Sequence, residues 1–173
     1  MAPNQEAAFE RIIRENGPAL RRLALGYGQT RADGDDLFQE ICFALWRALP
    51  SFRGDCSERT FAFRIGHNRG LTFRSRRRPD PIELADEITD GRPGPDSQAA
   101  AALERVRLLD AVRQLPEPHR QVVLLSLEDL SHADIAQVLG ITENNVAVRL
   151  NRAKKALRAI LSPELEEIHE RRG

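Results

Sequence analysis

The periodicity of apolar residues is the feature that most constrains the fold of this 173-residue chain. Apolar residues recur at spacings of three and four over almost every ordered stretch, which is typical of amphipathic helices, and no stretch alternates as a strand does. Residues 79–96 break the pattern with four prolines, two glycines and many acidic side chains, a composition typical of a flexible linker. The sequence therefore predicts an all-α protein with two small helical domains joined by a flexible acidic linker.

The position of the linker sets the domain boundaries. We expect a first domain, the linker, a second domain and an acidic tail over residues 1–79, 80–97, 98–162 and 163–173. Each domain is just large enough to enclose a small core. Helices in the first domain are expected over about residues 6–25, 33–50 and 58–78. Gly66 and Gly70 fall inside the third of these helices, where each costs about 1 kcal/mol relative to alanine, and nothing in the sequence explains them.

The composition of the chain excludes several classes of function. With 26 basic and 26 acidic residues, the net charge indicates no polyanionic partner. The amino-terminal stretch lacks the apolar segment of a signal peptide, and no apolar run approaches the roughly 18 residues of a membrane span. Two cysteines and four scattered histidines form no disulfide framework, metal-ligand pattern or catalytic set. We therefore expect a cytoplasmic protein that is not an enzyme and uses neither a metal nor a cofactor.

The distribution of charge along the chain is more informative than its sum. Seven arginines and no acidic residue lie between Arg59 and Arg78, and the segment from Arg149 to Arg158 is basic again. In contrast, residues 80–96 contain six acidic residues and one arginine. This asymmetry indicates two separate surfaces that meet an anion.

The strongest local pattern lies between residues 131 and 158 and predicts a helix-turn-helix. Ser131 followed by Asp134 is a capping-box pattern, which begins a helix. Gly140 can adopt the left-handed conformation of a sharp turn, and Thr142 is a suitable N-cap for the next helix. We expect two short helices here, the second of which is buried through a continuous apolar stripe of Val146, Leu150, Ala153 and Leu157.

The opposite face of this second helix carries Asn144, Asn145, Val148, Arg149, Arg152 and Lys155. Amides near a helix N-terminus can pair with base edges in the major groove, and arginine can pair with guanine or with phosphate. The face therefore predicts contact with duplex DNA. A solvated cationic face is the alternative interpretation, since that is the commoner meaning of a run of charges.

Another candidate surface lies on the helix expected over residues 33–50. Its apolar stripe consists of Leu37, Ile41, Leu45 and Ala48. The opposite side carries Asp36, Glu40, Phe43 and Arg47. An exposed phenylalanine among acidic side chains suits the docking of a basic partner. A merely solvated face is again the alternative.

The third expected helix interleaves cations with aromatic rings along one side, at Arg59, Phe63, Arg69, Phe73 and Arg77. Cations neutralise the backbone of single-stranded DNA, and aromatic rings stack on its unpaired bases. The periodicity leaves a second interpretation open, in which the aromatic side chains belong to the core and the arginines are solvated.

Together these segments resemble the extracytoplasmic-function group of bacterial sigma factors over nearly the full chain. The specific pieces are "DDLFQE", "ALPSFRGD", "RTFAFRIGHN" and "NNVAVRLNRAKKAL". The first three resemble parts of the family's second conserved region, and the last resembles part of its fourth. The resemblance implies an alternative sigma factor that binds core RNA polymerase and directs promoter recognition, promoter melting and transcription initiation.

The resemblance also implies roles for particular residues. The segment that grips the clamp helices of the polymerase β′ subunit matches Asp36, Leu37, Gln39 and Glu40, beside the docking candidate Phe43. The loop that captures a flipped base of the minus-ten element, and the helix that follows the melted strand, match Ser51, Phe52, Arg53, Gly54, Asp55, Arg59, Phe63, Arg64, Asn68, Arg76 and Arg77. The helix that reads the duplex minus-thirty-five element matches Thr142, Asn144, Asn145, Val148, Arg149, Arg152 and Lys155.

The partners implied by the resemblance are core RNA polymerase, through its β′ clamp helices and β flap, promoter DNA, and an anti-sigma factor of the kind that commonly inhibits the family. Asn145 stands where many relatives carry threonine, and Gly66 and Gly70 where alanine is usual, which leaves the promoter sequence open. Two other functions compete. A stand-alone helix-turn-helix regulator of duplex DNA has no reason to carry "DDLFQE", and an adaptor without promoter selectivity would leave the face around Asn144 idle.

Overall fold

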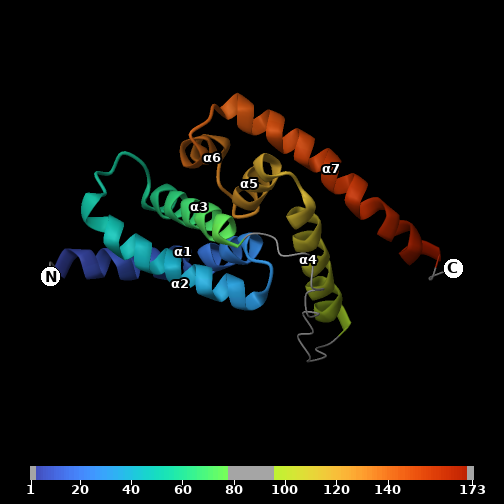
Figure 1. The fold of residues 1–173 in the computed structure, drawn as a ribbon, viewed down its shortest axis with the longest axis horizontal. Helices are drawn as coiled ribbons and strands as arrows, with labels where there is room; N and C mark the ends of the chain where they lie inside the picture. Colours follow the sequence, from blue (N-terminus) through green and yellow to red (C-terminus); the bar gives the residue numbers. More distant parts are fainter. Residues whose placement is uncertain (1–2, 78–95, 171–173) are drawn as a thin grey trace.

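The computed structural model describes residues 3–77 and 96–170, with side chains over residues 5–77 and 100–162. All regular structure in these ranges is helical, which confirms the predicted fold class. The elements are α1 (Pro3–Tyr27), α2 (Arg31–Ala48), the 3₁₀ turn η1 (Leu49–Ser51), α3 (Glu58–Arg76), α4 (Asp96–Gln114), α5 (Glu117–Ser126), α6 (His132–Leu139) and α7 (Glu143–Glu170) (Figure 1). The predicted linker over 80–97 lies, except for its last two residues, outside the described residues.

Local capping chemistry explains where the helices begin. The Thr30 hydroxyl accepts a hydrogen bond from the Asp33 amide at 3.1 Å, and the Asp33 carboxylate accepts one from the Thr30 amide at 3.1 Å. This reciprocal capping box begins α2 two residues earlier than predicted. The predicted caps of the helix-turn-helix are confirmed, since the Ser131 hydroxyl accepts from the Asp134 amide and the Thr142 hydroxyl from the Asn145 amide.

The expectation of a short second helix in the helix-turn-helix was wrong. α7 runs over 28 residues, from Glu143 to Glu170, and thus continues into the acidic tail. Between Arg158 and Glu170 the sequence contains four glutamates and two leucines, which are strong helix formers, beside the single Pro163, and Ile160 still packs against the core. Local propensity and this distal packing therefore extend the helix.

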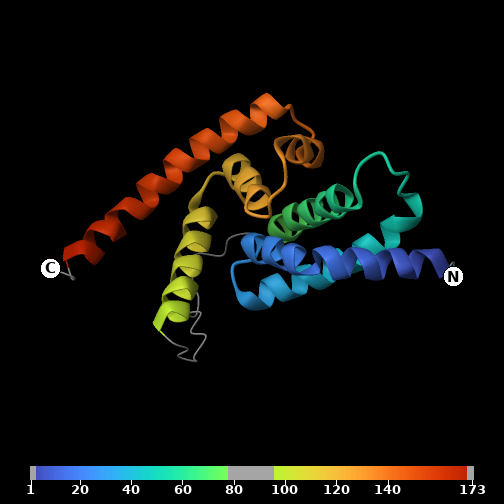
Figure 2. The same ribbon diagram turned by 180° about the vertical axis from the view of Figure 1, so that it is seen from behind.

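The first module consists of α1, α2 and α3, which pack around a shared core (Figure 1). Its largest fully buried side chains are Ile12, Leu20, Leu23, Leu37, Ile41, Leu45 and Phe63. α1 and α2 contribute to that set because their apolar residues recur on one face, whereas α3 buries small and polar residues beside Phe63. Figure 2 shows α1 along the back of this module, with its carboxyl-terminal end directed toward α4.

The two glycines of α3 allow it to approach α1 closely. A Cβ atom at Gly70 would lie 2.5 Å from the Tyr27 ring, and one at Gly66 would lie 3.1 Å from Leu23. Any larger residue at Gly70 would therefore push the two helices apart. This packing requirement explains why the third helix tolerates the local cost of glycine.

The second module consists of α4, α5, α6 and α7. Its buried set includes Val112, Leu115, Val122, Leu125, Ile135, Val146, Leu150 and Ala153, so the stripe predicted on α7 does face the core. The two modules also pack against each other, through α6 on α3 and through α4 and α5 on α1. Buried residues of both modules consequently belong to one continuous apolar cluster.

A buried polar pair joins α1 to α3. The Tyr27 hydroxyl lies 2.6 Å from Nδ1 of His67, and both side chains are almost completely buried. Burial raises the pKa of the Tyr27 phenol and lowers the pKa of His67 from 6.5 to about 4. His67 is therefore neutral in the folded protein at pH values where the unfolded chain already protonates it.

This shift predicts an acid-sensitive fold. Above pH 6.5 His67 is neutral in both states, whereas between pH 6.5 and 4 only the unfolded state takes up the proton. The free energy of unfolding should therefore fall as the pH decreases through this window, by up to about 1.4 kcal/mol per pH unit. Denaturant titrations at several pH values would measure it. His67→Gln should flatten this part of the profile, whereas the same change at the exposed His132 should leave it unaltered.

Candidate nucleic-acid and polymerase surfaces

The outer face of α7 presents the side chains predicted to read duplex DNA. Asn144, Asn145, Val148, Arg152 and Lys155 are exposed, as is the capping residue Thr142. The stripe on the opposite side of the helix holds this face outward. The turn before α7 depends on Gly140, whose backbone is left-handed with a φ of 66°, as predicted. The second module therefore presents one continuous polar and cationic face.

Arg149 differs from its neighbours because it is half-buried and already held in place. Its Nε donates a hydrogen bond of 2.9 Å to Oδ1 of Asn145, one turn earlier on the same helix. The bond leaves the terminal nitrogens of the guanidinium available for a bidentate contact. Asn145 thus orients Arg149 before any DNA binds.

The outer face of α2 carries most of the residues predicted to contact polymerase. Asp36 and Gln39 are exposed, and Phe43 is 63% exposed, with the Arg47 guanidinium 5.7 Å from the centre of its ring. Glu40 is half-buried and lies 3.5 Å from Arg76 of α3. Leu37, in contrast, is fully buried in the core, so it supports this surface from beneath and does not belong to it.

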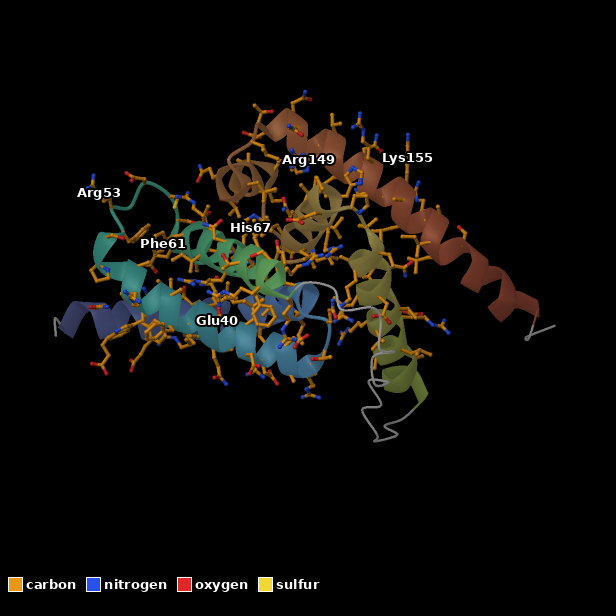
Figure 3. All side chains as sticks on the ribbon, in the orientation of Figure 1. Glu40, Arg53, Phe61, His67, Arg149 and Lys155 are labelled. Atoms are coloured by element: carbon orange, nitrogen blue, oxygen red, sulfur yellow. The ribbon has the colours of Figure 1, made fainter. Side chains whose placement is uncertain are left out.

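The loop between α2 and α3 projects from one end of the first module, and Figure 3 shows Arg53 at its tip. Ser51, Arg53, Gly54 and Asp55 are exposed. Gly54 has a φ of 77°, a left-handed conformation that favours glycine. Phe52 anchors the loop, since its ring centre lies 4.6 Å from that of Phe61 at the start of α3. The loop is therefore held at its base and open at its tip.

The aromatic residues of α3 resolve the alternative that the sequence left open. Phe63 is fully buried and Phe73 nearly so, which means that these rings fill the core and do not face solvent. The arginines lie over them: the guanidinium of Arg59 is 5.0 Å from the centre of the Phe63 ring, and that of Arg77 is 4.9 Å from the centre of the Phe73 ring. Phe63 therefore packs in the core, and its ring is not available for the predicted stacking on a base.

The cations of α3 are partly engaged with the rest of the protein. Arg76 and Arg77 are exposed and pair with Glu40 and Asp33, and Asn68 is exposed. Arg64 is half-buried and contacts the Cys56 sulfur at 3.6 Å. The predicted minus-ten residues therefore lie on α3 and its preceding loop, but their cations face different neighbours, since Arg59 bonds Asn16 of α1 whereas Arg76 and Arg77 pair with residues of α2.

The sequence reasoning missed Asn16, which positions one of these cations. Its Oδ1 accepts a hydrogen bond of 2.9 Å from Arg59, and its Nδ2 donates to the Ile12 carbonyl at 3.1 Å. Asn16 is only 4% exposed. A polar residue inside the apolar stripe of Ile12, Leu20 and Leu23 is the signal that could have identified it.

No helix within the described ranges is long and apolar enough to cross a lipid bilayer. Within the same ranges, no group of three or more histidine, cysteine, aspartate or glutamate side chains could bind a metal ion.

Comparison with known families places both modules in one class of protein. Residues 12–79 match Sigma-70 region 2, and residues 105–157 match Sigma-70 region 4. The order of the two regions follows that of the two helical modules. The fold and its two exposed faces thus define a two-domain sigma factor.

Individual relatives narrow this class. The chain is 32% identical to the RNA polymerase sigma factor CnrH of Cupriavidus metallidurans, over 96% of this chain and 93% of the relative. It is also 32% identical to the ECF RNA polymerase sigma factor SigL of Mycobacterium tuberculosis, over 90% of each chain. The chain belongs to the extracytoplasmic-function family of RNA polymerase sigma factors. It therefore directs promoter recognition and transcription initiation, and it is not itself an enzyme.

Solved structures agree with this assignment. The structure of CnrH in complex with the cytosolic domain of CnrY superposes with a TM-score of 0.69 at 29% identity, covering 91% of this chain and 90% of that one. The sigma factor RpoE from Bartonella quintana, solved with the anti-sigma factor NepR, superposes with a TM-score of 0.67 at 19% identity, over 89% of this chain and 96% of that one. At 19% identity, the likeness to RpoE supports the fold alone.

Proposed function

We propose that the two modules of this sigma factor divide promoter recognition between them. Residues 1–79 bind core polymerase and the minus-ten element, and residues 98–162 bind the minus-thirty-five element, with 80–97 as the connection and 163–173 as an acidic tail. The separation of the exposed faces supports this division. In Figure 3 Glu40 lies on α2 on one side of the molecule, whereas Arg149 and Lys155 lie along α7 on the other.

Core polymerase binds the outer face of α2 through Asp36, Gln39, Glu40 and Phe43. The exposure of Phe43 is the observation that carries this assignment, since a phenylalanine that is 63% exposed among acidic side chains has the character of an interface anchor. The β′ clamp helices are the expected partner of this face, and the β flap that of the second module.

The minus-ten element meets the loop and the adjoining side of α3. The exposed loop tip around Arg53 accommodates a flipped base, with Phe52 and Phe61 as the apolar floor beside it. Arg59, Arg64, Asn68, Arg76 and Arg77 supply polar and cationic contacts along the melted strand. Phe63 has no part in this surface.

The minus-thirty-five element is read in duplex form by α7. Asn144, Arg149 and Val148 contact base edges, with Asn145 as a positioning residue for Arg149. Thr142, Arg152 and Lys155 contact the phosphate backbone. The hydrogen bond between Asn145 and Arg149 supports the base-reading assignment, because an oriented guanidinium is what bidentate recognition of guanine requires.

We further propose that this chain works in the cytoplasm, where polymerase and promoters are found, and that an anti-sigma factor inhibits it. The relative CnrH has been solved in complex with the cytosolic domain of CnrY, which supports an inhibitor of this kind.

In vitro transcription tests the whole assignment. The purified chain is added to core RNA polymerase on a genomic DNA library, and the starts of the transcripts are sequenced. We expect transcripts from a limited set of promoters that share two elements. Complex formation without promoter-specific starts would favour the adaptor, and failure to bind core would exclude the sigma function.

The polymerase face predicts a specific loss of core binding. Phe43→Ala and Asp36→Lys should each weaken the complex with core polymerase by about tenfold, because the first removes an exposed apolar anchor and the second reverses a charge that faces a basic partner. Fluorescence anisotropy with labelled chain would measure the affinity. Glu104→Lys, a charge reversal at an exposed position of α4, is the matched control and should bind as the parent does.

The α7 face predicts two different kinds of defect. Arg149→Ala should cost on the order of 1–3 kcal/mol at promoters with the preferred base and relax selectivity at that position. Lys155→Ala should weaken binding to all promoter sequences alike and reduce the salt dependence of the affinity by the amount expected for about one phosphate contact. Transcription by the reconstituted holoenzyme from a library randomised in the minus-thirty-five element would separate the two. A uniform loss for Arg149→Ala would reassign it to the phosphate backbone.

A further inference from the structure

We propose that polar contacts between the two modules form a latch that keeps the free sigma factor closed and withholds the beginning of α3 from DNA. The latch consists of Arg22, Arg59 and Thr60 of the first module and Glu128 and Asp134 of the second. The inference rests on the proposed minus-ten role of α3.

The central contact of the latch is the ion pair between Arg22 and Glu128. The Arg22 guanidinium donates to both carboxylate oxygens of Glu128, with Nε at 3.0 and 3.1 Å and Nη2 at 2.7 Å. Glu128 is 6% exposed, although it lies in the turn after α5, close to the start of the helix-turn-helix. The Arg22 side chain is itself 60% exposed, so removal of Arg22 would leave the Glu128 carboxylate buried without its partner for as long as the modules stay closed, which favours opening.

The backbone of the same turn captures Arg59. Nη2 of Arg59 donates a hydrogen bond of 2.5 Å to the Glu128 carbonyl, while Nη1 donates to Asn16. The next residue, Asp129, has a φ of 58°, a left-handed conformation that non-glycine residues seldom adopt. Arg59 is thus held from three sides, by the Glu128 carbonyl, the Asn16 amide and the Phe63 ring. A DNA phosphate and the Glu128 carbonyl compete for the same guanidinium.

A second contact ties the helix-turn-helix to α3. The Thr60 hydroxyl donates to Oδ1 of Asp134 at 2.8 Å, and the Ser131 hydroxyl donates to its Oδ2 at 2.5 Å. These two hydrogen bonds, first that of Ser131 and then that of Thr60, lower the pKa of Asp134 and keep it charged. The amino-terminal end of α6 therefore lies directly against the amino-terminal end of α3.

Apolar contacts accompany the latch, since buried residues of both modules belong to one cluster. A Cβ atom at Gly26 of α1 would clash with the buried Leu124 of α5, so the two helices touch at this point. Arg113 of α4 also donates to the Leu25 carbonyl at 3.2 Å. Interfaces between domains of one chain generally resemble transient interfaces, and this one combines the apolar contacts with the polar contacts of the latch.

The latch leaves other functional surfaces accessible. Arg53 at the loop tip and Lys155 on α7 are both exposed in the closed chain, and Figure 3 shows them on different parts of the molecule. The closed chain can therefore meet duplex DNA through α7 but has to release Glu128 before a strand can follow α3 from its beginning. The apparent affinity of the chain for a single strand therefore equals the affinity of the open form multiplied by the fraction of molecules that are open.

Energy transfer between two dyes on the full-length chain tests whether the latch exists. Dyes are attached to cysteines introduced at the exposed Glu10 of α1 and Arg158 of α7, after replacement of Cys42 by alanine and Cys56 by serine. Arg22→Ala combined with Thr60→Val should lower the transfer efficiency. Arg21→Ala is the matched control, because the neighbouring arginine pairs with Asp35 inside the first module. Equal transfer in parent and latch variant would overturn the proposal.

Binding of a single-stranded oligonucleotide of mixed sequence, without polymerase, tests what the latch withholds. The latch variant should bind about fivefold more tightly than the parent, as expected if closed molecules predominate. Adding Arg59→Ala should remove the gain. Glu128→Gln, which keeps the shape of the side chain, should also tighten binding of the oligonucleotide. Because it is a single conservative change, it tests the latch even where the double variant misfolds. A latch variant that opens but binds the oligonucleotide no more tightly than the parent would overturn the inference. The transcription assay tests the sigma function separately.

Discussion

The close approach of α3 to α1 is the constraint on which the other features of the first module depend. Gly70 lies against the Tyr27 ring, and the Tyr27 hydroxyl meets His67 one turn earlier on the same helix. Because α3 sits this close, Phe63 is completely enclosed and the arginines of the helix are directed outward along its sides. A wider spacing would open the core and disperse the cations that the minus-ten surface requires.

The same packing defines which side chains can serve recognition. On α2, Leu37 is enclosed while Phe43, less than two turns along, remains exposed without an apolar neighbour that covers it. On α7, the enclosed Val146 and Ala153 direct Asn145 and Arg152 to the outside. Two helices in different modules therefore follow one rule, in which the core fixes the orientation and the opposite face is left for a partner.

Much of this could be predicted from the sequence because the relevant signals are local. The helical class follows from apolar spacing, and the turn at Gly140 and the caps at Ser131 and Thr142 follow from backbone chemistry within a few residues. Other features are not local. The sequence could not decide whether Phe63 stacks on bases or fills the core, because both uses require the same spacing. Nor could it reveal that Asn16 is a hydrogen-bond partner of Arg59, since the two residues lie on different helices.

The helical class, the caps of the helix-turn-helix and the exposed faces of α2 and α7 could be read from the sequence, because they depend on interactions over three or four residues. The length of α7 and the capping box of α2 were not predicted. The way in which the two modules meet depends instead on contacts between residues far apart in the sequence. Glu128 contacts Arg22 and Arg59, which lie 106 and 69 residues earlier in the sequence, and Thr60 contacts Asp134, 74 residues later. No periodicity encodes contacts over such separations. Their partners are chosen by the three-dimensional arrangement of α1, α3 and the turn after α5, which exists only once both cores have formed.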